Sequence, residues 1–171
     1  QFPMPFGSGG GDPEFYPADE PHLAAGGAIL GNWLTNPAAL NSFWRSVTSI
    51  PTTWELNTET AIIYAVDGGH HGVSNLRADL DADNGIYVWV NGRYKFGARQ
   101  PGLPSPLGQY EYTNVFLGEL NPGSNYIQIL REDSGIAAGY QFRLSGTVLA
   151  TSQQPPIITL SPATQSTSGG N

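Results

Sequence analysis

The feature that most restricts the fold is a run of alternating residues interrupted by a cluster of carboxylates. Asn75–Leu80 alternates polar with apolar residues, Ile86–Val90 alternates aliphatic with aromatic residues, and the pair Asn91-Gly92 follows the second run. A period of two is typical of β-strands, and Asn-Gly is favoured at the two central positions of a type I′ hairpin turn. We therefore predict two strands joined by an acidic turn, with the second strand entering a hairpin.

The same alternation elsewhere predicts an all-β chain. Further strands are expected at Trp54–Leu56, Thr60–Val66, Arg93–Phe96, Tyr112–Leu117, Tyr126–Arg131 and Tyr140–Leu149. The 22 glycines and 14 prolines favour many turns. About eight short antiparallel strands are typical of a β-sandwich, and we predict a jelly roll, with a closed barrel as the structural alternative.

One short helix is expected outside the sheets. Asn36 is a favourable N-cap and Pro37 suits the first helical position. The apolar residues that follow, as far as Val47, recur at helical spacing. We therefore predict one amphipathic helix of about three turns in this segment.

The sequence divides into a body and two arms. Residues 28–150 are predicted to form the jelly-roll body, residues 1–27 an extended arm rich in glycine and proline, and residues 151–171 a second extended arm. The first arm contains more aromatic residues than a solvated linker usually does, and the second contains a strand-like apolar run. We predict that the arms bind a partner protein through Phe2, Phe6, Phe15, Tyr16, Ile157, Ile158 and Leu160.

Composition excludes several kinds of partner. The net charge of -7, with only seven scattered Lys and Arg, would repel a phosphate backbone, so no nucleic acid is expected to bind. No apolar run approaches the roughly 18 to 20 residues of a spanning helix, so we expect no membrane span. The chain begins at Gln1, as it would after removal of a signal peptide. We therefore expect an exported protein, periplasmic or extracellular and associated with the cell surface.

Two segments resemble galactose-binding-like jelly-roll modules. In the first, Asp83-Asn84-Gly85 precedes a strand that ends in Asn91-Gly92. In the second, Leu117 to Asp133, an Asn-Pro-Gly turn precedes a strand of alternating aliphatic residues. The resemblance covers about residues 29–149 and implies a jelly roll that serves as a sugar binder, a calcium-stabilised spacer or a structural subunit. It implies no enzyme.

The chain is especially similar to exported bacterial proteins that carry a PEP-CTERM sorting tail. The similarity lies in Asn32-Trp33-Leu34 and in the segment Thr58 to Tyr64. Residues 161–171 contain no Pro-Glu-Pro, no apolar segment and no basic end, so the sorting tail itself is missing here. This resemblance implies an exported binding or structural module.

A calcium site is one interpretation of the acidic turn. Strand alternation would place Asp79, Asp81 and Asp83 on one face, with their oxygens converging near Asn84. Ca²⁺ binds about six to eight oxygen ligands, so these residues and some backbone carbonyls could form most of a site, to which Glu132 and Asp133 could contribute. The alternative is a solvated turn whose side chains cap local backbone groups.

The second predicted strand carries two large aromatic residues. Tyr87 and Trp89 alternate with residues expected in the core. They could form a platform on which a sugar stacks, form a protein interface, or pack beneath an arm.

The sequence contains no Gly-x-Ser-x-Gly elbow, His-Glu-x-x-His motif or Walker loop, and no cysteine nucleophile. We therefore predict no enzymatic activity.

These observations predict a non-catalytic structural or accessory subunit that works outside the cytoplasm. Its arms and an aromatic sheet face would dock on other subunits of an envelope or extracellular assembly. The alternative is a carbohydrate-binding, lectin-like module that calcium could stabilise. In that case Tyr87 and Trp89 would bind the glycan.

Overall fold

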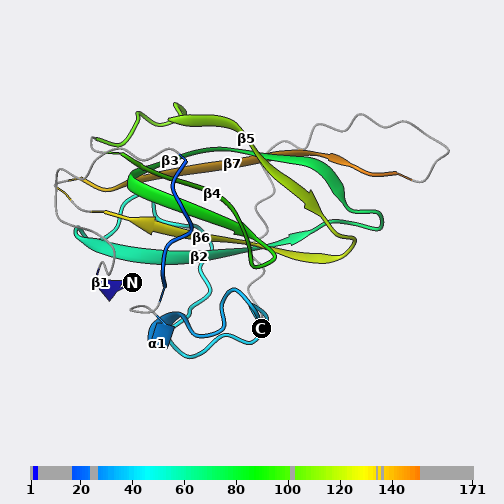
Figure 1. Cartoon of the computed structure of the whole chain (residues 1–171), viewed down its shortest axis with the longest axis horizontal. Coiled ribbons are helices and arrows are strands. Elements are labelled where there is room, and N and C mark those ends of the chain that lie inside the picture. The colour runs from blue at the N-terminus through cyan, green and yellow to red at the C-terminus, as the bar shows by residue number, and fades with distance from the viewer. Residues whose placement is uncertain are drawn as a thin grey trace.

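The computed structural model describes residues 2–3, 17–23, 27–100, 103–133, 135 and 137–150, with the backbone alone at Phe2, Pro3 and Gln100 (Figure 1). In chain order the elements are β1 (Phe2–Pro3), α1 (Gly27–Leu30), β2 (Thr58–Asp67), β3 (Val73–Val90), β4 (Arg93–Gln100), β5 (Tyr112–Leu120), β6 (Ser124–Glu132) and β7 (Gly139–Val148). All the strand pairings are antiparallel. The predicted all-β class is confirmed.

The strands form two sheets that share β3. The large sheet has the order β1-β2-β6-β3-β4, and in the small sheet β3 lies between β5 and β7. The part of β3 up to Asp83 pairs in the small sheet, and the part from Asn84 onward pairs in the large one. Figure 1 shows β5 and β7 on one side of the molecule and β2 and β6 on the other. The fold is therefore an antiparallel β-sandwich, as predicted.

The predicted acidic turn is a corner within β3. Residues 68–72 connect the end of β2 to Val73, and Val90 pairs with Ile127 near that same end of the sandwich. Both ends of β3 therefore lie at what we call the far end. At the opposite, corner end, the chain crosses from the small sheet to the large sheet at Asp83 and Asn84. The turn thus joins two sheets inside one strand rather than forming a loop between two strands.

The main core lies between the two sheets. The residues of β3 that were predicted to share a face are 0% to 3% exposed on both sides of the corner: Leu76, Ala78, Leu80, Ile86, Val88 and Val90. Tyr140 of β7 is buried among them, and Phe142, Leu144 and Val148 are packed against the same cluster. The period of two therefore located the core face correctly.

The predicted helix at residues 37–47 does not form, and the helix of the described chain is α1, Gly27–Leu30. The side chain of Asn41 gives a physical reason. Its Oδ1 accepts a hydrogen bond from the backbone N–H of Phe43 at 3.0 Å, and its Nδ2 donates to the carbonyl of Ile29 at 3.0 Å. Such bonds compete with the backbone bonds of a helix. The segment is irregular as a result.

A second apolar layer covers the outer face of the large sheet. Tyr87, Trp89 and Leu130 project from the sheet and pack against Leu30 and Trp33. The ring of Trp33 lies 5.4 Å from that of Trp89, and it stacks on Trp44, whose ring centroid is 5.8 Å away. Figure 1 shows α1 and the loop after it on the side of the large sheet away from β5 and β7. The molecule therefore has three layers: the small sheet, the large sheet and this outer apolar layer.

The described part of the N-terminal arm belongs to this layer. Ala18 donates its N–H to the carbonyl of Gly97 at 2.8 Å and accepts a hydrogen bond from the hydroxyl of Tyr94 at 2.7 Å. Glu20 accepts a hydrogen bond from the indole of Trp89 at 2.6 Å. Residues 17–23 of the predicted arm therefore pack on the body of their own chain.

Candidate functional site

The edge of the large sheet at β2 is the most distinctive surface feature. On one side β2 pairs with β6 from Glu59 to Asp67. On the other side β1 pairs only with Thr58 and Glu59. Within the described chain, no strand pairs with residues 60–67 on that side. This unpaired edge offers backbone N–H and C=O groups to an added strand.

A groove of about 700 Å³ runs along this edge. One wall is β2 itself, from Thr60 to Ile63 and at Ala65. The other wall is the irregular segment before β2 and contains several large apolar side chains, namely Leu40, Phe43, Trp44, Ile50 and Trp54. Phe43 is 68% exposed, which is unusual for a ring of this size. We call this feature the β2 groove.

Arg131 fixes the wall of the β2 groove next to the start of β2. Its guanidinium lies 4.1 Å from the ring centroid of Trp54 and 4.9 Å from that of Tyr140, and it donates to the carbonyl of Pro51 at 2.6 Å. Burial lowers the pKa of Arg131 to about 10, so the group stays charged at neutral pH. The indole of Trp54 also donates to the carbonyl of Thr58 at 3.1 Å. These contacts hold Trp54 outside any sheet, so the strand predicted at Trp54–Leu56 is absent.

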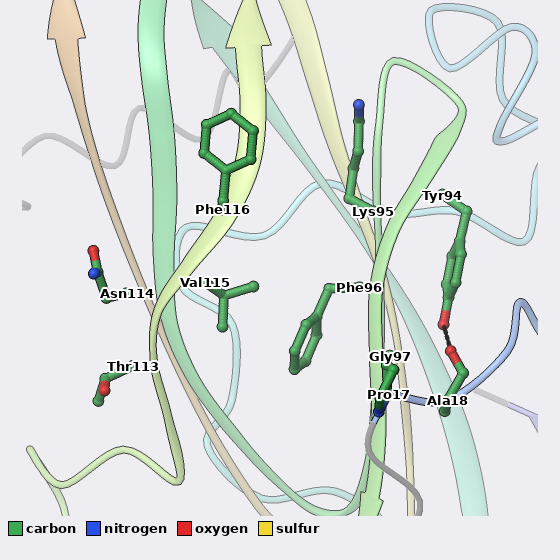
Figure 2. A pocket seen from close by; sticks show the side chains of 10 residues that line it. All are labelled: Pro17, Ala18, Tyr94, Lys95, Phe96, Gly97, Thr113, Asn114, Val115 and Phe116. Carbon is green, nitrogen blue, oxygen red and sulfur yellow. Dashed lines mark hydrogen bonds between the residues drawn. The ribbon is translucent and has the colours of Figure 1, made fainter.

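A smaller hollow of about 370 Å³ lies between β4 and β5 (Figure 2). Phe116 is 58% exposed at its rim. Figure 2 shows Phe116 and Lys95 on opposite sides of the hollow, with Val115 and Phe96 between them. Its lining mixes the apolar side chains of Val115 and Phe116 with polar ones from Tyr94, Lys95, Thr113 and Asn114. It is the smaller of the two surface features.

Two of the four residues predicted to bind calcium, Asp79 and Asp81, bond to different parts of the chain. Asp79 forms an ion pair with Arg143 and accepts a hydrogen bond from the backbone N–H of Asn114 at 2.7 Å. Asp81, 0% exposed, accepts a hydrogen bond from the backbone N–H of Ser105 at 2.9 Å. In the part of the chain that the structure describes, no group of three or more His, Cys, Asp or Glu side chains is placed to hold a metal ion. The convergence of Asp79 with the other carboxylates was therefore a wrong prediction.

The structure does bring Asp83 close to Asp133, as the sequence suggested for the end of β6. Asp83 is 1% exposed, and its two carboxylate oxygens have no hydrogen-bond partner among the described residues. Burial and the nearby charges of Asp133 and Asp81 raise the pKa of Asp83 to about 7. Asp133 in turn accepts a hydrogen bond from the backbone N–H of Asn57 at 2.6 Å. The predicted solvated turn is therefore a buried one, and Asp83 is protonated in part at neutral pH.

A second buried carboxyl pair was not predicted. Glu59 of β2 and Glu132 of β6 are cross-strand neighbours, and both are 0% exposed. Arg99 of β4 forms an ion pair with Glu132 at 2.5 Å. Burial, and then repulsion from Glu132, raise the pKa of Glu59 to about 9 despite the charge of Arg99. Glu59 is therefore a neutral acid in the folded protein at pH 7.

Both carboxyl pairs are buried beneath the surface of the described chain. The four side chains are 0% or 1% exposed, and none of them lines the β2 groove or the hollow between β4 and β5.

One signal in the sequence could have predicted that Glu59 is buried. It alternates with Ala61 and Ile63, which pack in the second apolar layer, so a strand from Thr58 places its carboxyl on that same covered face.

The two rings predicted as a sugar platform are covered. Tyr87 is 3% exposed and Trp89 is 0% exposed, beneath the layer that contains Leu30 and Trp33. Stacking on a sugar requires an accessible ring face, so this pair has no such role in the folded chain. The alternative interpretation, packing beneath an arm, matches the contact between Trp89 and Glu20.

The predicted partner-binding residues fall mostly outside the described chain. Phe2 is described at its backbone, which pairs with Glu59 of β2. The others, whose placement is not described, are Phe6, Phe15, Tyr16, Ile157, Ile158 and Leu160. The pairing of β1 shows that the edge of β2 accepts an antiparallel strand.

Comparisons with known proteins add no family. No protein-family model matches the sequence, and neither the curated proteins nor the solved structures give a match. Within the described residues, no helix has the length and hydrophobicity that crossing a lipid bilayer requires.

Proposed function

We propose that this chain is a non-catalytic structural or accessory subunit that works outside the cytoplasm and docks on a larger protein assembly through the β2 groove. The observation that carries the proposal is the edge of β2, which has no described partner strand over residues 60–67 and has an apolar groove beside it. The jelly-roll topology and the galactose-binding-like resemblance are part of the same proposal.

An added strand would gain two kinds of contact at this edge. Its backbone would bond to the unpaired groups of β2, and its alternate side chains would enter the groove beside Ile63 and Trp44. The exposed ring of Phe43 would then be covered by the partner. Backbone bonds provide affinity in this mode of binding, and the pockets for side chains provide specificity.

The experiment places one charge in the groove. Ala65→Lys puts an ammonium group on the β2 wall, where strand addition would have to bury it. Ser145→Lys makes the same change of charge at an exposed position of β7 and serves as the control. Each variant is produced in the native cells, and its sedimentation is measured in extracts of the cell envelope.

We expect the wild-type chain and Ser145→Lys to sediment with a large assembly, and Ala65→Lys to sediment as a free subunit. The proposal fails if the wild-type chain is itself free, or if Ala65→Lys remains in the assembly. Circular dichroism of the purified variant shows whether Ala65→Lys is folded. If it is not, the smaller change Ala65→Ser replaces it and is expected to give a partial release.

Carbohydrate binding is a second candidate, and the observation that favours it is the presence of Trp44 and Trp54 along the β2 groove. Indole rings are frequent stacking surfaces for sugar rings. A glycan array probed with the purified chain tests this role. Binding that disappears in Trp44→Ala would support it, and an array without any bound glycan would reject it.

A further inference from the structure

We propose that the segment Ile157–Leu160 of this same chain adds an antiparallel strand to the edge of β2, so that the docking surface carries a strand of its own which a partner must displace. This inference rests on the proposed function for the role of the edge, and it identifies what regulates access to that edge.

The first argument is the place where the described chain ends. Leu149 donates its N–H to the carbonyl of Gly72 at 3.0 Å, in the connection that follows β2. The chain therefore reaches Ala150 at the far end of the sandwich, beside the connection that joins β2 to β3.

The second argument is that β7 and β2 lie on the same flank. The hydroxyls of Tyr64 in β2 and Tyr140 in β7 are 2.9 Å apart, and the ring of Tyr64 stacks on Phe142 with centroids 5.5 Å apart. The opposite flank is formed by β4 and β5, on whose strands the smaller hollow lies. A chain that leaves β7 is therefore across the core from β2, on the flank that carries the β2 groove.

The third argument is length and direction. Facing sheets are about 10 Å apart, and the residues between Ala150 and Ile157 can span roughly 20 Å when extended, so the connection is long enough. Both β2 and β7 run toward the far end, as their pairings with β6 and β3 show. A segment that turns back there runs antiparallel to β2. Pro155 and Pro156 lie in the connection, where the absence of two N–H groups leaves no ladder bond unmade.

The fourth argument is chemical. Residues 157–160 read Ile-Ile-Thr-Leu, a run of strand-forming and mostly apolar residues between Pro156 and Ser161. The β2 groove supplies an apolar wall for alternate side chains of such a strand. The edge of β7 would also be within reach, but its outward residues Arg143, Ser145 and Thr147 are exposed and no groove lies along them. The apolar segment therefore fits β2 better.

The short connection makes the intramolecular contact effective. A tether of this length gives an effective concentration of the order of millimolar, so even weak strand pairing keeps the edge occupied in the isolated protein. A partner whose strand binds more tightly would displace the segment. The same segment would then be released to contact another subunit.

The test uses the purified full-length chain and amide hydrogen exchange. In Ile158→Asp/Leu160→Asp, two carboxylates replace the side chains that would face one side of the added strand. We expect amides of residues 60–67 that face the edge to exchange at least about 10-fold faster than in the wild type, while amides of β5 on the opposite flank stay unchanged. Gln153→Asp/Gln154→Asp has the same charge change in the connection and is expected to exchange like the wild type.

A synthetic peptide covering residues 153–163 provides the second readout. Added to Ile158→Asp/Leu160→Asp, it should restore slow exchange at residues 60–67, and a peptide with the same two aspartates should not. Three results would overturn the inference: equal exchange in both variants and the wild type, protection that maps to β7 instead of β2, or protection that rises with protein concentration alongside a dimer in sedimentation. None of these three affects the Ala65→Lys test, so the proposed function can stand or fall separately.

Discussion

Glu59→Gln should make this protein more stable at neutral pH, although it removes a fully buried residue. Glu59 is 0% exposed, both of its carboxylate oxygens lack a hydrogen-bond partner among the described residues, and its cross-strand neighbour is Glu132. Burial and that neighbour raise its pKa from 4.5 to about 9. Glutamine has nearly the same shape and no proton to lose, so the substitution isolates the electrostatic cost of the acid.

The sign follows from proton binding. Between pH 4.5 and about 9 the folded chain keeps a proton on Glu59 that the unfolded chain has lost, so the free energy of unfolding falls as the pH rises through this range. At pH 7 the loss is about 3 kcal/mol. The variant lacks this term, so it should exceed the wild type by about 3 kcal/mol at pH 7 and equal it near pH 4.

Urea unfolding followed by tryptophan fluorescence, at several pH values from 4 to 9, measures the effect. Glu119→Gln is the matched control, because Glu119 lies on β5 and is exposed, and it should leave the curve of stability against pH unchanged. The reasoning would be refuted by a Glu59→Gln curve that runs parallel to the wild-type curve, or by a variant that is less stable than the wild type at pH 7.

Three further predictions concern stability and use the same assay. Asp83→Asn should raise the free energy of unfolding above pH 7 by at most about 4 kcal/mol and have little effect near pH 4. The reason is that burial and the acidic neighbours of Asp83 raise its pKa from 3.8 to about 7. A difference in stability that does not change with pH would contradict this prediction. Trp33→Ala should lower stability by about 3 to 5 kcal/mol, because this ring is 2% exposed between two other tryptophans, and a loss below about 1 kcal/mol would show that the second apolar layer contributes little. Gly92→Ala should cost at least about 1 kcal/mol, because its φ is 75° and an added Cβ would lie 2.4 Å from the carbonyl oxygen of Leu34. Gly123→Ala, with the same φ and no atom within 4 Å, separates the contact from the backbone strain, and equal losses at both glycines would reject the contact.

Much of the fold could be predicted because its signals are local. Alternation over Asn75–Leu80 and Ile86–Val90 identified the core face of β3, and the pair Asn91-Gly92 marked the turn to β4. The helix expected at residues 37–47 illustrates the limit of such signals. Its apolar spacing suits a helix, but the hydrogen bonds of Asn41 hold a different backbone. Which of two local conformations forms depends here on a contact with Ile29, which no periodicity reveals.

The burial of the carboxyl groups depends on the register of the strands, so it was harder to predict. The acidic residues near Asp83 were visible as a cluster, but whether they are solvated depends on the sheets that meet at the corner. Glu59 gave a weaker signal, because its neighbours in space are Glu132 on β6 and Arg99 two strands further across the sheet. The row from Glu59 to Glu132, Gly85 and Arg99 exists only when three antiparallel registers are known.

The two parts of β2 differ in what lies against their outer edge. Thr58 and Glu59 pair with β1, whereas within the described chain residues 60–67 have no partner strand on that side. At Thr58 and Glu59 the strand carries a buried acid, and β1 covers the edge at these two residues. From Thr60 onward the residues beside the groove, Ala61, Ile63 and Ala65, are apolar and partly exposed. A strand that binds there contacts mainly apolar side chains. Glu59→Gln should therefore change the stability of the chain and leave docking at Ala65 unchanged, so the stability and the binding of β2 should respond to different substitutions.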